Sequence, residues 1–214
     1  MAVLKKQSNW NNLYFYQKSE VLYQLTVVFC NRFLPKYGDR TVDQMVQAAR
    51  SGKQNIVEGL ADGMTSTEMQ LKLLNVARAS LQELHEDYCD YLQAHKLVQW
   101  DSSHPRFKPL QDYCKTNNHI EKYKHFFERW NDEEMANCAI TLCHMTDVLM
   151  LRYINKIEKI FVQEGGIKER MYAARTGYRK QQDELYKKLE QENSQLKIEV
   201  EKLKHLLAQH GIEY

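Results

Sequence analysis

Residues 65–92 read TSTEMQLKLLNVARASLQELHEDYCDYL, and this stretch decides the fold class. Apolar side chains recur in it at steps of three or four residues, which places them on one face of an α-helix. They are Leu71, Leu74, Ala77, Leu81, Leu84, Tyr88 and Leu92. Thr65 and Glu68 have the spacing of a capping box, which predicts where the helix starts. A stripe of this length is typical of a bundle helix that neighbouring helices cover.

Two further helices are expected on the amino-terminal side. Residues 13–34 form the first, which ends before Pro35 because proline cannot continue a helix. Leu22, Leu25, Phe29 and Phe33 share its apolar face. The second starts with Thr41 as its N-cap and runs through Val57, and a narrow face of small residues lets a neighbouring backbone approach it closely. That face consists of Met45, Ala48, Ala49, Gly52 and Ile56, and Gly59 and Gly63 lie near the helix end.

On the carboxyl side, the pattern first weakens and then returns. Residues 100–131 contain Pro105 and Pro109 among many aromatic residues, which predicts short, irregular helices. A long fourth helix then starts with Asp132 as its cap and ends at Gly165 and Gly166.

Composition agrees with an all-helical chain. The 214 residues include 8 glycines and 3 prolines, too few for a turn-rich all-β fold. We therefore predict an all-α fold with two domains. Residues 1–166 form an up-down four-helix bundle with an irregular helical insertion at about 100–131, and residues 167–214 form a basic helix and a coiled-coil tail.

The tail carries a heptad pattern. Leu189, Leu196 and Leu203 occupy d positions, and Asn193, Val200 and Leu207 occupy a positions after Tyr186. A single Asn at a, with Leu at d, favours two parallel strands in register. The flanking pairs, Glu192 with Lys197 and Glu199 with Lys204, would attract each other across such a dimer. The alternative is a long helix that folds back on the bundle.

A basic tract precedes these heptads. Between residues 168 and 188, lysines and arginines outnumber acidic residues, and Arg170, Arg175, Arg179 and Lys180 are candidates for contacts with nucleic-acid phosphates. A basic helix that leads into a parallel dimer is the arrangement of zipper-type DNA-binding proteins. The alternative is a solvated, charged helix face.

Asn55, Glu58 and Glu83 are the other polar residues of interest. We expect them to have a structural role, satisfying helix ends and the turn at Gly59, with a contact to a ligand or RNA as the alternative. No phosphate-binding loop, nucleophile elbow or zinc-ligand spacing occurs in the sequence. We therefore expect no enzymatic activity, no cofactor and no metal site.

The sequence also bears on compartment. No signal peptide is apparent at the amino terminus, and the weakly charged stretch 135–151 is shorter than the roughly 20 residues of a membrane span. The five cysteines form no secreted-domain pattern, which favours reduced thiols. A cytoplasmic protein without membrane contact is expected.

Two segments carry a family resemblance. Residues 44–59 read QMVQAARSGKQNIVEG and residues 77–84 read ARASLQEL. They resemble the bacterial four-helix-bundle proteins encoded in intervening sequences of ribosomal RNA genes, together with the accessory variability determinant protein of diversity-generating retroelements. The matching positions are Gln44, Ala48, Ala49, Ser51, Asn55, Ile56, Glu58, Gly59, Ala77, Ser80, Leu81, Glu83 and Leu84.

The segments EEMANCAITL (133–142) and FVQEGGIKERM (161–171), followed by Arg175, resemble the "four helix bundle suffix" extension of some members. The resemblance implies an up-down bundle, association into a pentameric ring and no catalytic activity. For the retroelement members it also implies binding of RNA and a reverse transcriptase through a basic surface.

These observations lead to two functional hypotheses. The first is a non-enzymatic oligomeric scaffold or adaptor for a protein or nucleic-acid partner, forming a pentamer by the resemblance or a dimer through the tail. The second is an RNA- or DNA-binding protein that uses the basic tract.

Overall fold

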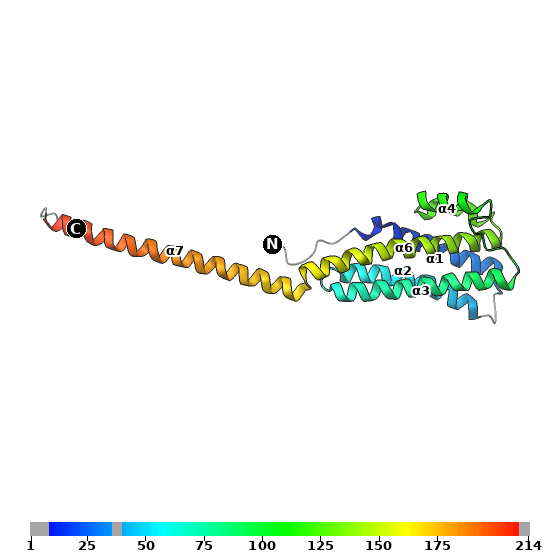
Figure 1. The fold of residues 1–214 in the computed structure, drawn as a ribbon, viewed down its shortest axis with the longest axis horizontal. Helices are drawn as coiled ribbons and strands as arrows, with labels where there is room; N and C mark the ends of the chain where they lie inside the picture. The colour runs from blue at the N-terminus through cyan, green and yellow to red at the C-terminus, as the bar shows by residue number, and fades with distance from the viewer. Residues whose placement is uncertain (1–8, 36–39, 210–214) are drawn as a thin grey trace. The chain divides into compact units, whose positions relative to one another are not determined.

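A computed structural model describes residues 9–35 and 40–209, and the prediction of an all-α fold is confirmed for them, because they contain helices and no strands. Figure 1 shows the elements in order along the chain. The helices are α1 (Tyr14–Phe33), α2 (Arg40–Asp62), α3 (Thr67–Ala94), α4 (Phe107–Thr116), α5 (Lys124–Phe127), α6 (Asp132–Glu164) and α7 (Ile167–Gln209), with 3₁₀ turns at Trp10–Asn12 and Ile120–Lys122.

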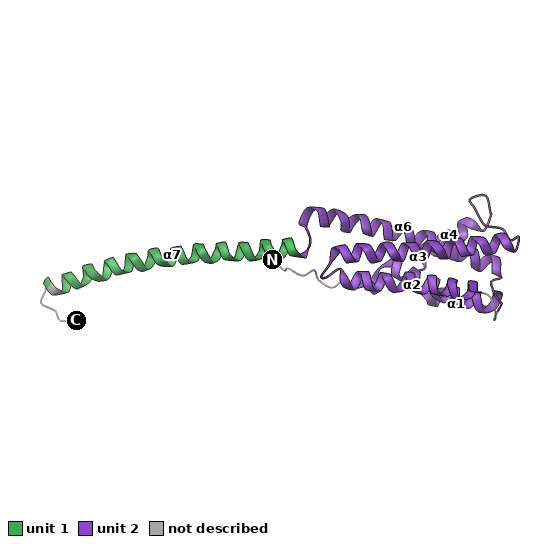
Figure 2. Ribbon diagram, turned by 90° about the horizontal axis from the view of Figure 1, so that it is seen from below, with its two compact units in different colours: residues 1–3, 168–214 green, residues 4–167 purple. Residues whose placement is uncertain are grey.

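The described residues divide into two compact units, which Figure 2 shows in different colours. Residues up to Ile167 form the first unit, and residues from Lys168 onward form the second, which consists of α7. Within the described ranges, no helix combines the length and apolarity that crossing a bilayer requires.

In the first unit, four long helices pack around one apolar core. α2 packs on both α1 and α3, and α6 packs on the same two helices. Their inward side chains are almost completely buried. The largest are Leu22, Leu25, Phe29, Met45, Ile56, Leu74, Leu81, Leu84, Tyr88, Leu92 and Met135, together with Tyr123 from the segment before α5. The one polar group of Tyr88 is satisfied, because its hydroxyl donates to Thr26 Oγ1 at 3.0 Å.

Small residues allow α2 and α3 to approach closely. A Cβ atom on Gly52 would lie 2.5 Å from Leu81 Cδ2, and one on Gly59 would lie 3.2 Å from Leu73 Cβ. Gly59 therefore acts inside α2, which continues to Asp62. α2 therefore runs past the predicted Val57, and it ends between Gly59 and Gly63, the two glycines predicted to bracket its end. Close packing against α3 accounts for Gly59 within the helix.

Two predicted helix starts, those of α3 and α6, are displaced by one residue, and the predicted cap of α2 lies inside the helix. α3 has Ser66 as its N-cap, and Ser66 Oγ accepts a hydrogen bond from the Met69 amide at 3.1 Å. Thr65 instead donates its hydroxyl to the Asp62 carbonyl of the preceding turn. α6 has a capping box made by Asn131 and Glu134, so Asp132 is its first residue and not its cap. α2 already includes Arg40, which places Thr41 inside its first turn.

Residues 100–131 form the irregular segment that the sequence predicts, with α4, a 3₁₀ turn and α5. α4 packs on α6. Aromatic rings hold this segment together: Phe126 stacks on Trp130 at a centroid distance of 4.5 Å, and Tyr113 contacts the edges of Tyr123 and Phe126. Cys114 and Cys138 meet where α4 and α6 pack, with their sulfur atoms 4.0 Å apart.

Candidate functional site

The face of α7 that carries the heptads exposes large apolar side chains. Leu196 is 58% exposed and Leu203 is 54% exposed, and Leu189 and Val200 are similar. A core leucine of the same spacing, such as Leu74, is 0% exposed. The predicted seam consists of Leu189, Asn193, Leu196, Val200, Leu203 and Leu207. Residues spaced four and three apart lie along one side of a helix, so α7 presents a continuous strip that a second helix could cover.

Charged residues flank this strip. Glu192, Lys197 and Glu199 are exposed beside it. Lys204 already makes an ion pair within its own helix, with 3.0 Å between its Nζ atom and Glu201 Oε1. An exposed pair of this kind is worth less than about 1 kcal/mol, so it leaves Lys204 able to pair with another carboxylate.

The four basic candidates also lie on α7, but not on one side of it. Counting back from Leu189 in steps of three and four residues leads to Tyr186, Gln182, Arg179 and Arg175. Arg175 and Arg179 are therefore exposed on the same side as the seam. Arg170, which is half-buried, and Lys180 point to other sides of the helix. The structure thus joins two of the four basic residues to the seam and separates the other two.

The polar residues of α2 and α3 do not form one cluster. Asn55 donates its amide to the Ser51 carbonyl at 2.9 Å and to Ser51 Oγ at 3.1 Å. Ser51 in turn reaches Ser80 Oγ on α3 at 3.1 Å. Glu58 is exposed and accepts from Gln54, and Glu83 lies exposed on the surface of α3. Asn55 therefore contributes to α2–α3 packing through a serine pair.

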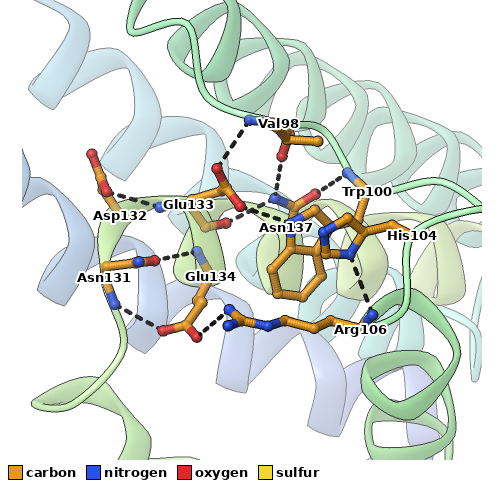
Figure 3. A network of polar contacts seen from close by, with 9 residues as sticks. All are labelled: Val98, Trp100, His104, Arg106, Asn131, Asp132, Glu133, Glu134 and Asn137. Carbon is orange, nitrogen blue, oxygen red and sulfur yellow. Dashed lines mark hydrogen bonds and ion pairs between the residues drawn. The ribbon is translucent and has the colours of Figure 1, made fainter.

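A polar network at the start of α6 was not predicted from the sequence. Figure 3 shows how Glu133 and Asn137 hold the segment that follows α3. Glu133 accepts from the Trp100 indole N–H at 2.9 Å and from the Val98 amide at 3.0 Å. Asn137 accepts from the Trp100 amide at 2.7 Å and donates to the Val98 carbonyl at 2.9 Å.

Arg106 completes this network, since it pairs with Glu134 at 2.8 Å. Glu134 is also the capping-box residue of α6. The first turns of α6 therefore fix both the helix start and the course of residues 98–106. No local pattern in the sequence indicates this arrangement, because the side chains that bond to Trp100 lie more than thirty residues away along the chain.

Comparison of the chain with protein-family models, with curated proteins and with solved structures found no match. Within the described residues, α7 has an exposed, regularly spaced apolar strip with charges on either side.

Proposed function

We propose that the protein is a non-enzymatic oligomeric scaffold in which α7 pairs with a second copy of itself as a parallel, two-stranded coiled coil. The observation that carries the proposal is the exposure of Leu189, Leu196 and Leu203 at seven-residue spacing. Covering each leucine is worth about 1.5–3 kcal/mol, so a strip of them favours association. Asn193 within the strip selects two strands and fixes their register, since two such amides can bond to each other across a dimer.

The first unit would then be the body that this coiled coil brings together. We infer that α1, α2, α3 and α6 form an up-down four-helix bundle, which their mutual packing supports. The sequence resemblance to the intervening-sequence family supports the same architecture, and the cysteine pattern favours a cytoplasmic location. It also makes RNA and a reverse transcriptase candidate partners, and a pentameric ring the rival to the dimer.

The chain offers a matched pair of variants to test the dimer. Leu196 at a d position is 58% exposed, and Ile198 on the far side of α7 is 56% exposed. In Leu196→Glu, two apolar contacts are lost per dimer and two charges are forced together, so the dissociation constant should rise about 1,000-fold. Ile198→Glu should leave it within about threefold of wild type. Light-scattering mass across a dilution series measures both.

Two results would contradict the dimer. If the two variants have the same mass as wild type at every concentration, then α7 does not hold the oligomer together. A five-chain mass that survives Leu196→Glu would support the ring instead of the coiled coil.

A second function, nucleic-acid binding, is favoured by the position of Arg175 and Arg179. These residues continue the seam upstream of Tyr186, so in a parallel dimer the four guanidinium groups of two chains would converge. Like charges repel at that place unless an anion lies between them. A phosphate backbone would supply that anion, and guanidinium groups bind phosphate in two-pronged geometry.

This second function has its own test. Binding of a labelled RNA or DNA duplex, followed by fluorescence anisotropy, should fall by at least about tenfold between about 50 mM and about 200 mM salt. Arg175→Glu with Arg179→Glu should abolish it, whereas Lys188→Glu, on another side of α7, should weaken it only by the loss of one phosphate contact. Binding that ignores salt, or that survives the double charge reversal, contradicts this function.

A further inference from the structure

The outer side of α6 forms the floor of a groove within the first unit. The groove has a volume of about 870 Å³ and also borders α1, α4 and the segment 99–102. Half-buried apolar residues of α6, namely Ile140, Met145, Val148 and Leu149, line its floor. Trp100 and Phe107 add aromatic surface. Pockets that bind small organic molecules have this size range and this mostly apolar lining.

A buried lysine also lines the groove. Lys18 of α1 is 3% exposed, and its ammonium group donates to the backbone carbonyl of Cys114. An ammonium group has three donors, and one carbonyl satisfies one of them. Among the described residues no carboxylate pairs with Lys18. Burial lowers the pKa of Lys18 below its usual value, and the neighbouring thiols of Cys114 and Cys138 act in the opposite direction.

Two other side chains of the groove carry positive charge. Lys115 of α4 and Arg152 of α6 lie along it. Among its described lining residues Asp101 alone is acidic, and its carboxylate already accepts from the Ser103 amide at 2.8 Å and from the Ser103 hydroxyl at 2.6 Å. The groove therefore combines an apolar floor with an excess of positive charge, which favours an anion over a cation or a neutral molecule.

A second polar residue of the groove, Asn118, has a side-chain oxygen without a partner among the described residues. Asn118 lies just after α4, and this oxygen is buried. Buried acceptors are normally paired. A ligand with an N–H or O–H donor would satisfy this oxygen, and its acid group would pair with the ammonium group.

We propose that this groove binds a small organic carboxylic acid with an aromatic or apolar body, whose carboxylate pairs with the ammonium group of Lys18. The body lies on the apolar face of α6, beside Trp100. The polar network of Glu133 and Asn137 holds Trp100 in place, so this wall of the groove is formed before the ligand arrives. The proposal does not depend on α7 or on the oligomeric state.

Three compounds with one ring system test the charge requirement. Indole-3-acetate is an aromatic carboxylate with an N–H donor, indole-3-acetamide is its neutral analogue and tryptamine is its cationic analogue. Calorimetric titration of the full chain should give saturable binding of the acetate, with affinity at least about tenfold higher than for the acetamide, and no binding of tryptamine. Equal affinities for all three compounds, or no saturable binding of the acetate at millimolar concentration, would overturn the proposal.

Variants locate the site. Lys18→Met keeps the length of the side chain and should weaken acetate binding at least about tenfold while it leaves the acetamide affinity unchanged. Lys115 is exposed, so Lys115→Met should leave the fold intact. This variant should weaken acetate binding several-fold. Lys72→Met on the exposed surface of α3 is the control and should change neither affinity. Unchanged acetate binding in both Lys18→Met and Lys115→Met would contradict the assignment.

Discussion

α3 and the carboxyl-terminal half of α7 both carry an apolar stripe, but the surroundings of the two stripes are opposite. In both helices, leucines and other apolar residues recur along one face, at steps of three, four or seven residues. In α3, Leu74 and Leu84 are 0% exposed because α2 and α6 cover them. In α7, Leu196 and Leu203 are more than half exposed. The comparison shows that an apolar stripe predicts that a helix needs a partner, but not whether that partner belongs to the same chain.

The largest expected effect tests the covered side of this comparison. Phe29 is 0% exposed and contacts the rings of Phe33, Tyr88 and Tyr91. Phe29→Ala should lower the free energy of unfolding by about 3–5 kcal/mol, since it leaves a cavity among four rigid helices. Urea unfolding followed by circular dichroism measures this loss. Val162→Ala, at an 83% exposed position of α6, is the control and should change stability by less than about 0.5 kcal/mol.

Alkaline pH should act on the covered core as well. Burial raises the pKa of the Cys30 thiol from 9.0 to about 12. In the unfolded chain this thiol ionises near pH 9.0, whereas in the fold it stays neutral, so the unfolded state loses its proton first. The contribution of Cys30 is therefore complete below pH 9 and declines as the pH rises toward about 12, by about 1.4 kcal/mol per pH unit.

The measurement is urea unfolding at about pH 8 and about pH 10.5, for wild type and for Cys30→Ala. Wild type should lose more stability between these two values than the variant does, and the difference is the contribution of this thiol. Identical losses in both proteins would show that the Cys30 thiol is not shielded from water.

A smaller effect is expected where α2 and α3 approach. The added methyl group in Gly52→Ala would meet Leu81 Cδ2, so the leucine side chain must move. Overpacking of this kind costs about 1–3 kcal/mol, and alanine returns about 1 kcal/mol through helix propensity. A net loss of about 1 kcal/mol is therefore expected in urea unfolding. A gain in stability would mean that the two helices separate easily.

The smallest effect, and the opposite sign, is expected in α7. A Cβ atom on Gly177 would meet nothing within 4 Å. Gly177→Ala should therefore raise the stability of α7 by about 0.5–1 kcal/mol, because alanine favours helix and adds no clash. Thermal melting of helical ellipticity measures this gain. A loss of stability would show that another helix lies against Gly177 in solution.

The helices of this protein could be predicted from its sequence because their stripes and stop signals are local. Helix starts were less certain, since neighbouring residues such as Thr65 and Ser66 are both good caps and only the geometry of the preceding turn selects one. The partners of Asn137 lie between α3 and α4, far from it along the chain, and no local pattern indicates them.

The site at Lys18 was not predicted from the sequence. It shares the spacing of Leu22, Leu25 and Phe29, so the sequence places a lysine on the core face of α1. That position was a signal of an unusual site. The group that accepts its hydrogen bond, the Cys114 carbonyl, lies 96 residues away, and its position depends on how α4 packs, which the sequence does not indicate.

The most direct test of the central claim is sedimentation equilibrium of the full chain over a wide range of concentration. The account predicts a reversible equilibrium between one chain and two, with the dimer dominant at micromolar concentration. A single-chain mass throughout would mean that the strip on α7 is covered by a different partner or by none. A mass of five chains would contradict the coiled-coil dimer and place the oligomer contacts in the first unit.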